Sequence, residues 1–267
     1  MLDEFTEQEI RRYARHIVMP EVGGTGQAKL RSARVLIVGA GGLGSPAAIY
    51  LAAAGVGTLG IVDDDEVELS NLHRQILHTE SALGRPKVES ARATIQGLNP
   101  LVKVETHRMR LKADNVEELI AAYDVVVDGS DNFPTKFLVN DACVFAGKPL
   151  SLAGIHRFEG QVMTILPHLG PCYRCVFIEP PPAGAVPSCE EAGVFGAVAG
   201  FAGCIQAVEV IKLILGVGQS LAGSILRIDT LRGSFRRVPV NRNPHCPVCS
   251  GEATITTLVD QALVCDE

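Results

Sequence analysis

The sequence lacks several features that would place it in a specialised class of protein. It has no uncharged apolar run of membrane-spanning length; the nearest candidate, residues 193–216, is interrupted by Glu209 and Lys212. It has no internal repeat, and no low-complexity tract longer than residues 180–182. Residues 1–4 are too acidic and polar to open a secretory signal. We therefore expect a cytoplasmic protein with no membrane association.

An excess of positive charge is also absent. The 24 lysines and arginines are outnumbered by 30 acidic residues, for a net charge of −6, which argues against a nucleic-acid partner. The chain has 267 residues, 47% of them hydrophobic, and is long enough for one large α/β domain. We expect a single domain, with an N-terminal helix and loop at 1–28, a core at 29–249 and a tail at 250–267.

Residues 34–65 carry the clearest motif. A short apolar run at 35–38 leads into a glycine-rich turn at 39–44, a small-residue helix follows, and a second strand at 58–62 ends at Asp63. The glycines, which are Gly39, Gly41, Gly42 and Gly44, allow backbone N–H groups to approach a phosphate at a helix N-terminus. Asp63 can accept hydrogen bonds from ribose hydroxyls. These residues alone favour a nicotinamide cofactor, and a turn that binds nothing is the alternative.

The remaining pattern alternates helices and strands. Helices are expected at 6–17 (with a Thr6–Glu9 capping box), 86–98, 114–122 (capped by Asp114), 132–146 and 193–216, and a loop at 20–28. Strands are expected at 102–106, 124–127, 149–155, 160–166, 223–229 and 234–239, the last two as a hairpin-like pair. This order predicts a Rossmann-like α/β fold: a mainly parallel sheet, helices on both faces and antiparallel C-terminal strands.

Candidate phosphate-binding residues follow the second and fourth strands. Residues 70–74 are typical of a polar helical turn that would project Asn71 and Arg74 toward the phosphates, and the planar fork of arginine suits that ligand. Lys87 opens a helix and is a candidate point charge, although alone it is more typical of a surface lysine. Asp131 follows the fourth strand, where it could hold Mg²⁺ on a polyphosphate, cap the next helix, or do both.

Four of the eight cysteines form two C-x-x-C pairs, Cys172/Cys175 and Cys246/Cys249. Four thiolates match a closed tetrahedral Zn²⁺ site, which is structural rather than catalytic. Because the pairs are far apart in the sequence, such a site would tie distant parts of one fold together. A redox pair and an iron–sulfur cluster are the alternatives.

Taken together, the motifs resemble the ThiF/MoeB/HesA enzymes, bacterial relatives of ubiquitin-activating enzymes. The resemblance rests on the glycine turn, residues 70–75 and 84–91, the pair Asp131-Asn132 and the cysteine pairs, which occur in the family's order between about residues 7 and 249. It implies a homodimeric adenylyltransferase that uses Mg·ATP. Its substrate would be the C-terminal Gly-Gly carboxylate of a small ubiquitin-fold sulfur carrier, and pyrophosphate would be released.

The resemblance also implies roles for individual residues. The nucleotide would be bound by Gly39, Gly41, Gly42, Gly44, Asp63, Asp65, Ser70, Asn71, Leu72, His73, Arg74, Lys87, Asp131 and Asn132. Asn71, Arg74 and Lys87 would grip the phosphates, and Asp131 would hold Mg²⁺. Arg15, which otherwise belongs to a solvated basic face, would cross the dimer and contact phosphate in the partner's site. Such a site works by neutralising charge and aligning reactants, with little acid–base catalysis.

Sulfur transfer is less determined by these motifs. Cys189 occupies the position of the family's crossover-loop cysteine, which forms a covalent link in some members; a plain loop residue is the other interpretation. A helix N-terminus could activate its thiol, and Glu190 and Glu191 oppose this. Because the sequence ends before a rhodanese domain, we expect an external sulfur donor protein. The pathway served, whether thiamin, molybdopterin, amino-acid or tRNA thiolation, stays open.

Three other functions compete with this interpretation. A nicotinamide oxidoreductase would leave Arg74, Lys87, Asp131 and the cysteine pairs without a purpose. A non-catalytic, zinc-stapled module for a ubiquitin-like partner would bind that partner regardless of ATP. A tRNA-modifying relative of the same fold is disfavoured by the acidic charge and the cysteine pairs.

Overall fold

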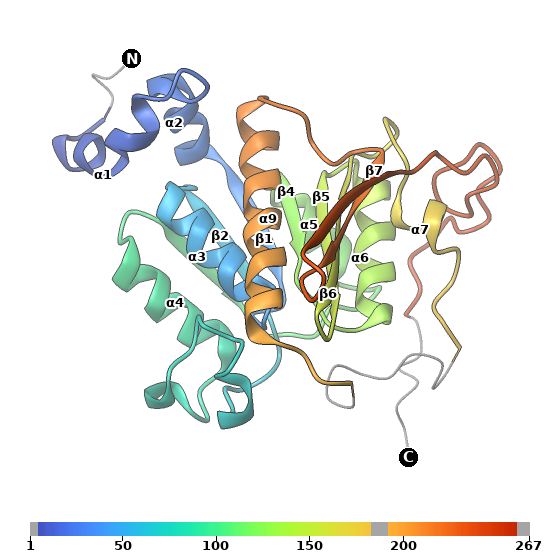
Figure 1. Ribbon diagram of the computed structural model, residues 1–267, viewed down its shortest axis with the longest axis horizontal. Coiled ribbons are helices and arrows are strands. Elements are labelled where there is room, and N and C mark those ends of the chain that lie inside the picture. Colours follow the sequence, from blue (N-terminus) through green and yellow to red (C-terminus); the bar gives the residue numbers. More distant parts are fainter. Residues whose placement is uncertain (1–4, 183–191, 261–267) are drawn as a thin grey trace.

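A computed structural model describes residues 5–182 and 192–260 of the chain. Within these residues one eight-stranded sheet forms the centre of the molecule, in the order β3-β2-β1-β4-β5-β6-β7-β8 (Figure 1). The strands are β1 (Arg34–Val38), β2 (Thr58–Val62), β3 (Lys103–His107), β4 (Val125–Asp128), β5 (Leu150–His156), β6 (Glu159–Ile165), β7 (Ser224–Asp229) and β8 (Ser234–Pro239).

The first five strands run parallel, and the last three pair antiparallel. β1 lies between β2 and β4, and β5 continues the parallel half beside β4. β6, β7 and β8 then follow as a meander. The predicted fold class is therefore confirmed, including the C-terminal hairpin of β7 and β8.

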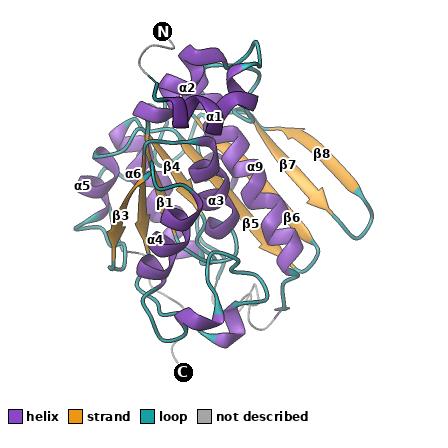
Figure 2. Cartoon of the chain, turned by 90° about the vertical axis from the view of Figure 1, so that its left-hand side faces the viewer, coloured by secondary structure: helices purple, strands orange, loops and turns teal. Residues whose placement is uncertain are grey.

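Helices cover both faces of the sheet. The described helices are α1 (Glu7–Ile17), α2 (Gly23–Ser32), α3 (Gly44–Ala54), α4 (Lys87–Leu98), α5 (Val116–Ala121), α6 (Phe133–Ala146), α7 (Tyr173–Val176) and α9 (Gly196–Leu215), with 3-10 turns η2 (Leu69–Asn71) and η3 (Glu80–Ala82). α3, α4 and α9 pack on one face, and α5 and α6 pack on the other (Figure 2).

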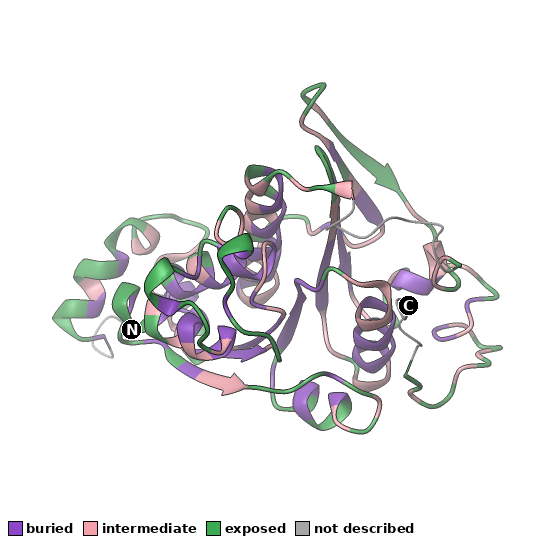
Figure 3. Ribbon diagram, turned by 90° about the horizontal axis from the view of Figure 1, so that it is seen from below, coloured by how far each residue is buried: buried purple, intermediate pink, exposed green. Residues whose placement is uncertain are grey.

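The core follows from the two-residue period of the central strands. In β1, Leu36 and Val38 join the cluster beneath α5 and α6, whereas Val35 and Ile37 join the cluster beneath α3, α4 and α9. Both faces are buried, as expected for parallel strands covered by helices (Figure 3). Truncating Ile37 to alanine would leave a cavity that costs about 2–5 kcal/mol of the free energy of unfolding.

α9 is the one helix in the described part of the chain that is long and apolar enough to cross a membrane. Half of its apolar 18-residue stretch is buried, and the helix packs against α3, β5 and β6. Its buried Glu209 forms an ion pair with Lys212 and accepts hydrogen bonds of 2.7 Å from Thr164 Oγ1 and from Leu221 N–H, which satisfies the charge inside the fold. These contacts are those of a core helix.

Local expectations were met unevenly at the helix ends. The Thr6–Glu9 capping box is present, since each side chain accepts from the other residue's backbone N–H. The expected loop at 20–28 is wrong, because α2 begins at Gly23. Although glycine-rich, α2 is held by packing against α9 and by buried Gln27, whose Nε2 donates to Ala54 O at 2.9 Å. The expected Asp114 cap is also wrong: α5 begins at Val116, after Asn115.

Candidate active site

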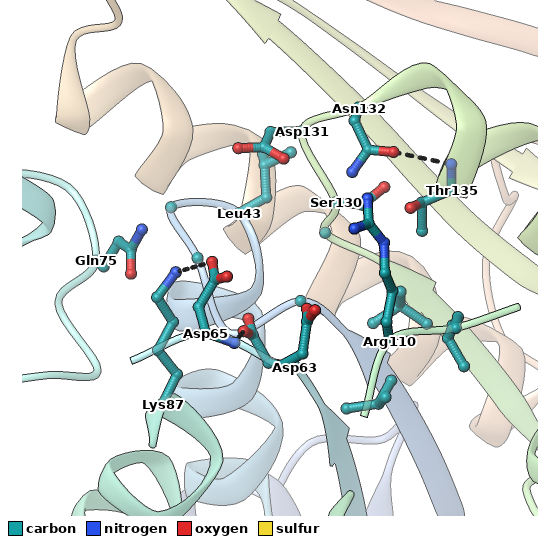
Figure 4. Close-up of a pocket in the computed structure, with 18 of the residues that line it drawn as sticks. Leu43, Asp63, Asp65, Gln75, Lys87, Arg110, Ser130, Asp131, Asn132 and Thr135 are labelled. Atoms are coloured by element: carbon teal, nitrogen blue, oxygen red, sulfur yellow. Dashed lines mark hydrogen bonds and ion pairs between the residues drawn. The ribbon is translucent and has the colours of Figure 1, made fainter. Parts of the chain in front are cut away.

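A cavity of about 290 Å³ opens at the carboxyl ends of the central parallel strands (Figure 4). This is where α/β sheets bind ligands, and the volume is near the lower end for small-molecule sites. Its polar and glycine lining consists of Gly39, Gly41, Gly42, Asp63, Asp64, Asp65, Arg74, Gln75, Lys87, Arg110, Gly129, Ser130, Asp131, Asn132 and Thr135. Apolar side chains that include Met109, Leu111, Ile155 and Val194 complete the walls.

The glycine turn between β1 and α3 forms the floor of the cavity. Gly39 has a φ of +86°, a conformation that L-amino acids with side chains rarely adopt. Gly44 lies so close to the Gly39 carbonyl that a Cβ would overlap it, so its role is the close approach of helix and turn. A Cβ on Gly41 would meet only Gln75 Nε2, at 3.8 Å, which leaves this backbone open to a ligand.

Asp63 ties the end of β2 to the glycine turn. Its Oδ2 accepts from Ala40 N–H at 2.8 Å and its Oδ1 accepts from Asp65 N–H at 2.9 Å. Burial raises the pKa of Asp63, while the charge of Lys87 and the two backbone hydrogen bonds act in the opposite direction. The carboxylate thus has a fixed orientation at the cavity wall.

Among the described residues, three cationic side chains line the cavity. Lys87 is 6% exposed, so it is not the surface lysine that its position alone favoured, and its Nζ lies 2.7 Å from Asp65 Oδ2. Arg74 Nη1 donates to Ser70 O at 3.0 Å. Arg110 follows β3, and Figure 4 shows its side chain reaching toward Ser130. Together they make the site suitable for a polyanion.

Asp131 and Asn132 follow β4 and have separate roles. Asn132 is the N-cap of α6, with its Oδ1 accepting from Thr135 N–H at 2.9 Å. Within the described residues Asp131 makes no such capping bond, so its carboxylate is available at the cavity. The preceding loop is fixed by buried Lys136, whose Nζ donates to Ser130 O at 2.7 Å and Asp128 Oδ2 at 3.1 Å.

Several residues expected at the nucleotide do not line this cavity. They are Gly44, Ser70, Asn71, Leu72 and His73. The side chain of Asn71, in η2, does not project toward the cavity as expected. It is 8% exposed, and its Oδ1 accepts from Glu68 N–H at 3.1 Å, so its side chain closes the turn instead.

Arg15 also lies outside the cavity's lining. Arg15 is exposed on α1, which Figure 2 shows beside α2 at one end of the sheet. Because α2 leads into the first residue of β1, this is the end opposite to the cavity. Cys189 falls outside the described residues.

The sequence motifs did not indicate Gln75, Arg110, Ser130 and Thr135 as site residues, nor the apolar wall made by Met109 and Leu111. That wall follows β3 directly, so the rule that ligands bind at the carboxyl ends of parallel strands would have found it. No comparable signal marks Thr135, which reaches the cavity only because α6 begins there.

Away from the cavity, the four cysteines of the C-x-x-C pairs meet in one group that could hold a metal ion, with all Sγ atoms within 4.8 Å of one another. Sγ–Sγ distances are 3.5 Å for Cys172–Cys246, 3.4 Å for Cys175–Cys249 and 3.9 Å for Cys172–Cys175. Four thiolates around one tetrahedral ion at about 2.3 Å would be separated by about 3.8 Å, so the donor set fits. Burial raises the pKa of Cys172, and it raises that of Cys175 to about 11. A bound cation would reverse this by favouring thiolates.

The glycine turn, the acid after β2 and the cations at the carboxyl edge of a parallel sheet place the chain in the Rossmann-like class of α/β proteins, a class that uses such features to bind nucleotides. The ThiF family model matches residues 13–248. A Thermus thermophilus protein named "Sulfur carrier protein adenylyltransferase" is 51% identical, with 98% of each chain covered. The "SAMP-activating enzyme E1" of Haloferax volcanii is 52% identical over 94% of this chain and 93% of its own. This chain belongs to the ThiF family.

A solved structure agrees with this assignment at the level of the fold. The structure titled "Crystal structure of E. coli MccB + ATP" superposes with a TM-score of 0.78 at 25% identity, covering 89% of this chain and 74% of that one. The similarity covers most of this chain and supports the fold assignment.

Proposed function

We propose that this protein is an adenylyltransferase that activates the C-terminal carboxylate of a small, ubiquitin-fold sulfur-carrier protein ending in Gly-Gly. The observation that carries the proposal is the cavity itself, in which Arg74, Lys87 and Asp131 converge above a glycine turn. It is supported by the 51% identity, over 98% of both chains, to a protein named for this activity.

The proposed reaction transfers AMP from ATP to the carrier. A carboxylate oxygen attacks the α-phosphorus, the bond from that phosphorus to the bridging oxygen breaks, and pyrophosphate leaves with the electron pair. No proton has to move, so the protein's task is to align two anions and neutralise their charge. Arg74 and Lys87 suit the phosphates, Gly41 offers open backbone, and Asp63 suits the ribose hydroxyls.

Mg²⁺ would be held by Asp131, whose carboxylate is a hard oxygen donor beside the proposed phosphates. When bound, the ion neutralises charge on the polyphosphate. Its remaining ligands would be phosphate oxygens and water, which is usual for this ion.

Zn²⁺ would occupy the four-thiol group, with a structural role. The knuckle that contains Cys172 and Cys175 is joined to α6 by Arg174, which donates bidentately to buried Asp141 at 2.8–3.0 Å. The second knuckle comes from the segment after β8. An ion shared between them would fasten the end of the chain's core to α6.

The proposed working unit is a cytoplasmic homodimer in which the partner subunit's Arg15 completes each site. Its support is the position of Arg15, which is exposed on α1 at the end of β1 opposite to the cavity of its own chain. An arginine in that place can serve a phosphate site only through another subunit.

The test is ATP–pyrophosphate exchange, measured with and without a panel of carriers that end in Gly-Gly. We expect exchange only when Mg²⁺, ATP and a matching carrier are all present, and none with that carrier lacking its last glycine. A carrier that binds equally well with and without ATP, and never supports exchange, would favour the binding-module alternative. Hydride transfer from a nicotinamide cofactor would overturn the proposal.

A further inference from the structure

Both backbone groups of Ala40, inside the glycine turn, are held by side chains. Its N–H donates to Asp63 Oδ2 at 2.8 Å, and its carbonyl lies 2.9 Å from His78 Nε2. Ser45 Oγ adds a longer bond of 3.3 Å to the same carbonyl. Ala40 is fully buried and His78 is 5% exposed, so neither contact is exchanged easily for water.

The contacts of His78 fix the proton on its ring. A carbonyl oxygen can only accept, so Nε2 carries the hydrogen and donates it to Ala40 O. Nδ1 then accepts from Ser90 Oγ, which lies 2.9 Å away. Burial lowers the pKa of His78, and the charge of Lys87 lowers it further, against the effect of the Ala40 bond, so the ring stays neutral at neutral pH.

Ser90 belongs to the first turn of α4, three residues after Lys87. The His78 ring is therefore a rigid bridge between the helix that carries Lys87 and the glycine turn that faces the same cavity. Lys87 is held independently on its other side, by its backbone N–H to Asp65 O at 2.9 Å and its Nζ to Asp65 Oδ2 at 2.7 Å. The bridge sets the position of the turn relative to this ammonium.

We propose that His78 is a positioning residue for the nucleotide, which keeps the glycine turn and Lys87 at the separation that the phosphates require. His78 is not among the residues that line the cavity, so it acts through Ala40 and Ser90 rather than by touching the ligand. This inference rests on the proposed function only in naming the ligand as a nucleotide.

The test compares His78→Leu with His78→Gln. Leucine removes both hydrogen bonds, whereas the Nε2 amide of glutamine can still donate to Ala40 O. The control is Thr164→Val in β6, away from the cavity, which removes a buried hydrogen bond to Glu209 of α9. We expect His78→Leu to bind a non-hydrolysable ATP analogue about tenfold more weakly by calorimetry, as the loss of one to two hydrogen bonds would give. His78→Gln should recover most of that loss, and Thr164→Val should bind as the wild type does.

Amide hydrogen exchange without nucleotide provides a readout that does not depend on the proposed function. Exchange of the peptide that contains residues 39–44 should speed up in His78→Leu and stay unchanged in Thr164→Val. If His78→Leu does not fold, Ser90→Ala should shift both readouts in the same direction by a smaller amount. Faster hydrogen exchange of the turn with wild-type affinity for the ATP analogue would overturn the role of His78 toward the nucleotide. Unchanged hydrogen exchange of the turn would overturn the proposal that His78 bridges it to α4. A wild-type protein that binds no nucleotide would refute the proposed function, while hydrogen exchange would still decide whether His78 holds the turn.

Discussion

Lys87 Nζ lies 2.7 Å from Asp65 Oδ2, which joins the first residue of α4 to the acidic segment after β2. The lysine side chain is 7% exposed, whereas the aspartate is 65% exposed, so the ammonium sits at the wall of the cavity with its partner toward solvent. An ammonium has three donors, and this contact uses one of them. The others are available to a polyphosphate.

We predict that Lys87→Gln lowers the rate of ATP–pyrophosphate exchange by about 10²-fold or more. The reason is the loss of a preorganised charge where negative charge develops in the transition state. The matched control is Lys103→Gln, at the opposite end of the sheet, where the side chain is 67% exposed. A folded Lys87→Gln protein with wild-type exchange would remove Lys87 from the proposed site.

The central strands and the glycine turn were predictable because their signals are local. Four apolar residues directly before a glycine turn are typical of a buried strand. The turn itself needs glycine at Gly39 and Gly44 for steric reasons alone. The placement of Asp63 after β2 follows from the same local pattern.

Other features depended on tertiary contacts that the sequence does not display. α2 forms despite its glycines because it packs against α9, from the other end of the chain. Lys87 is buried because Asp65 lies beside it, and Asn71 turns inward because Glu68 N–H offers a bond. Arg110 belongs to no motif, and only the position of β3 in the sheet brings it to the cavity.

We predict one zinc ion per chain, lost together with stability when Cys172 is replaced by serine. Removing one ligand leaves three thiols, two of them buried, without a closed site, and metal binding contributes directly to folding. Elemental analysis and thermal unfolding of the same sample measure the two effects. Cys204→Ser is the control, because Cys204 lies on α9 outside the four-thiol group. Iron with sulfide, or an unchanged melting temperature after zinc removal, would contradict the assignment.

Stability should also depend on Glu105 in a defined range of pH. Burial tends to raise its pKa, but bonds from Lys103, Tyr123 and Arg34 outweigh this and lower the pKa from 4.5 to about 2. The nearest contacts are 2.7–2.9 Å. A lowered pKa means that the ionised carboxylate stabilises the folded protein above about pH 4.5, and that this contribution disappears as the pH falls from 4.5 to 2.

We therefore expect Glu105→Gln to lower the free energy of unfolding at pH 7 by about 1 kcal/mol, which is a few degrees in melting temperature. The difference from wild type should shrink as the pH approaches 2. Exposed Glu118 provides the control Glu118→Gln, for which we expect little change at either pH. A difference that stays constant between pH 7 and pH 2.5 would show that packing, not charge, is responsible.

The position of Arg15 leads to a complementation experiment. Arg15→Ala and Asp131→Ala should each abolish pyrophosphate exchange, because each removes one charge from every site of a symmetric dimer. In a mixed dimer, the subunit with an intact Asp131 receives the intact Arg15 of the other subunit, so one of the two sites is complete. Mixing the two inactive proteins under conditions of subunit exchange should therefore restore activity.

If Arg15 served the cavity of its own chain, every site in the mixture would lack one residue. The shared-site model thus predicts an active mixture, and the own-chain model predicts an inactive one. Mass spectrometry of the mixture verifies that hybrid dimers formed. Activity that stays at the level of the single variants, with hybrids present, would rule out the shared site.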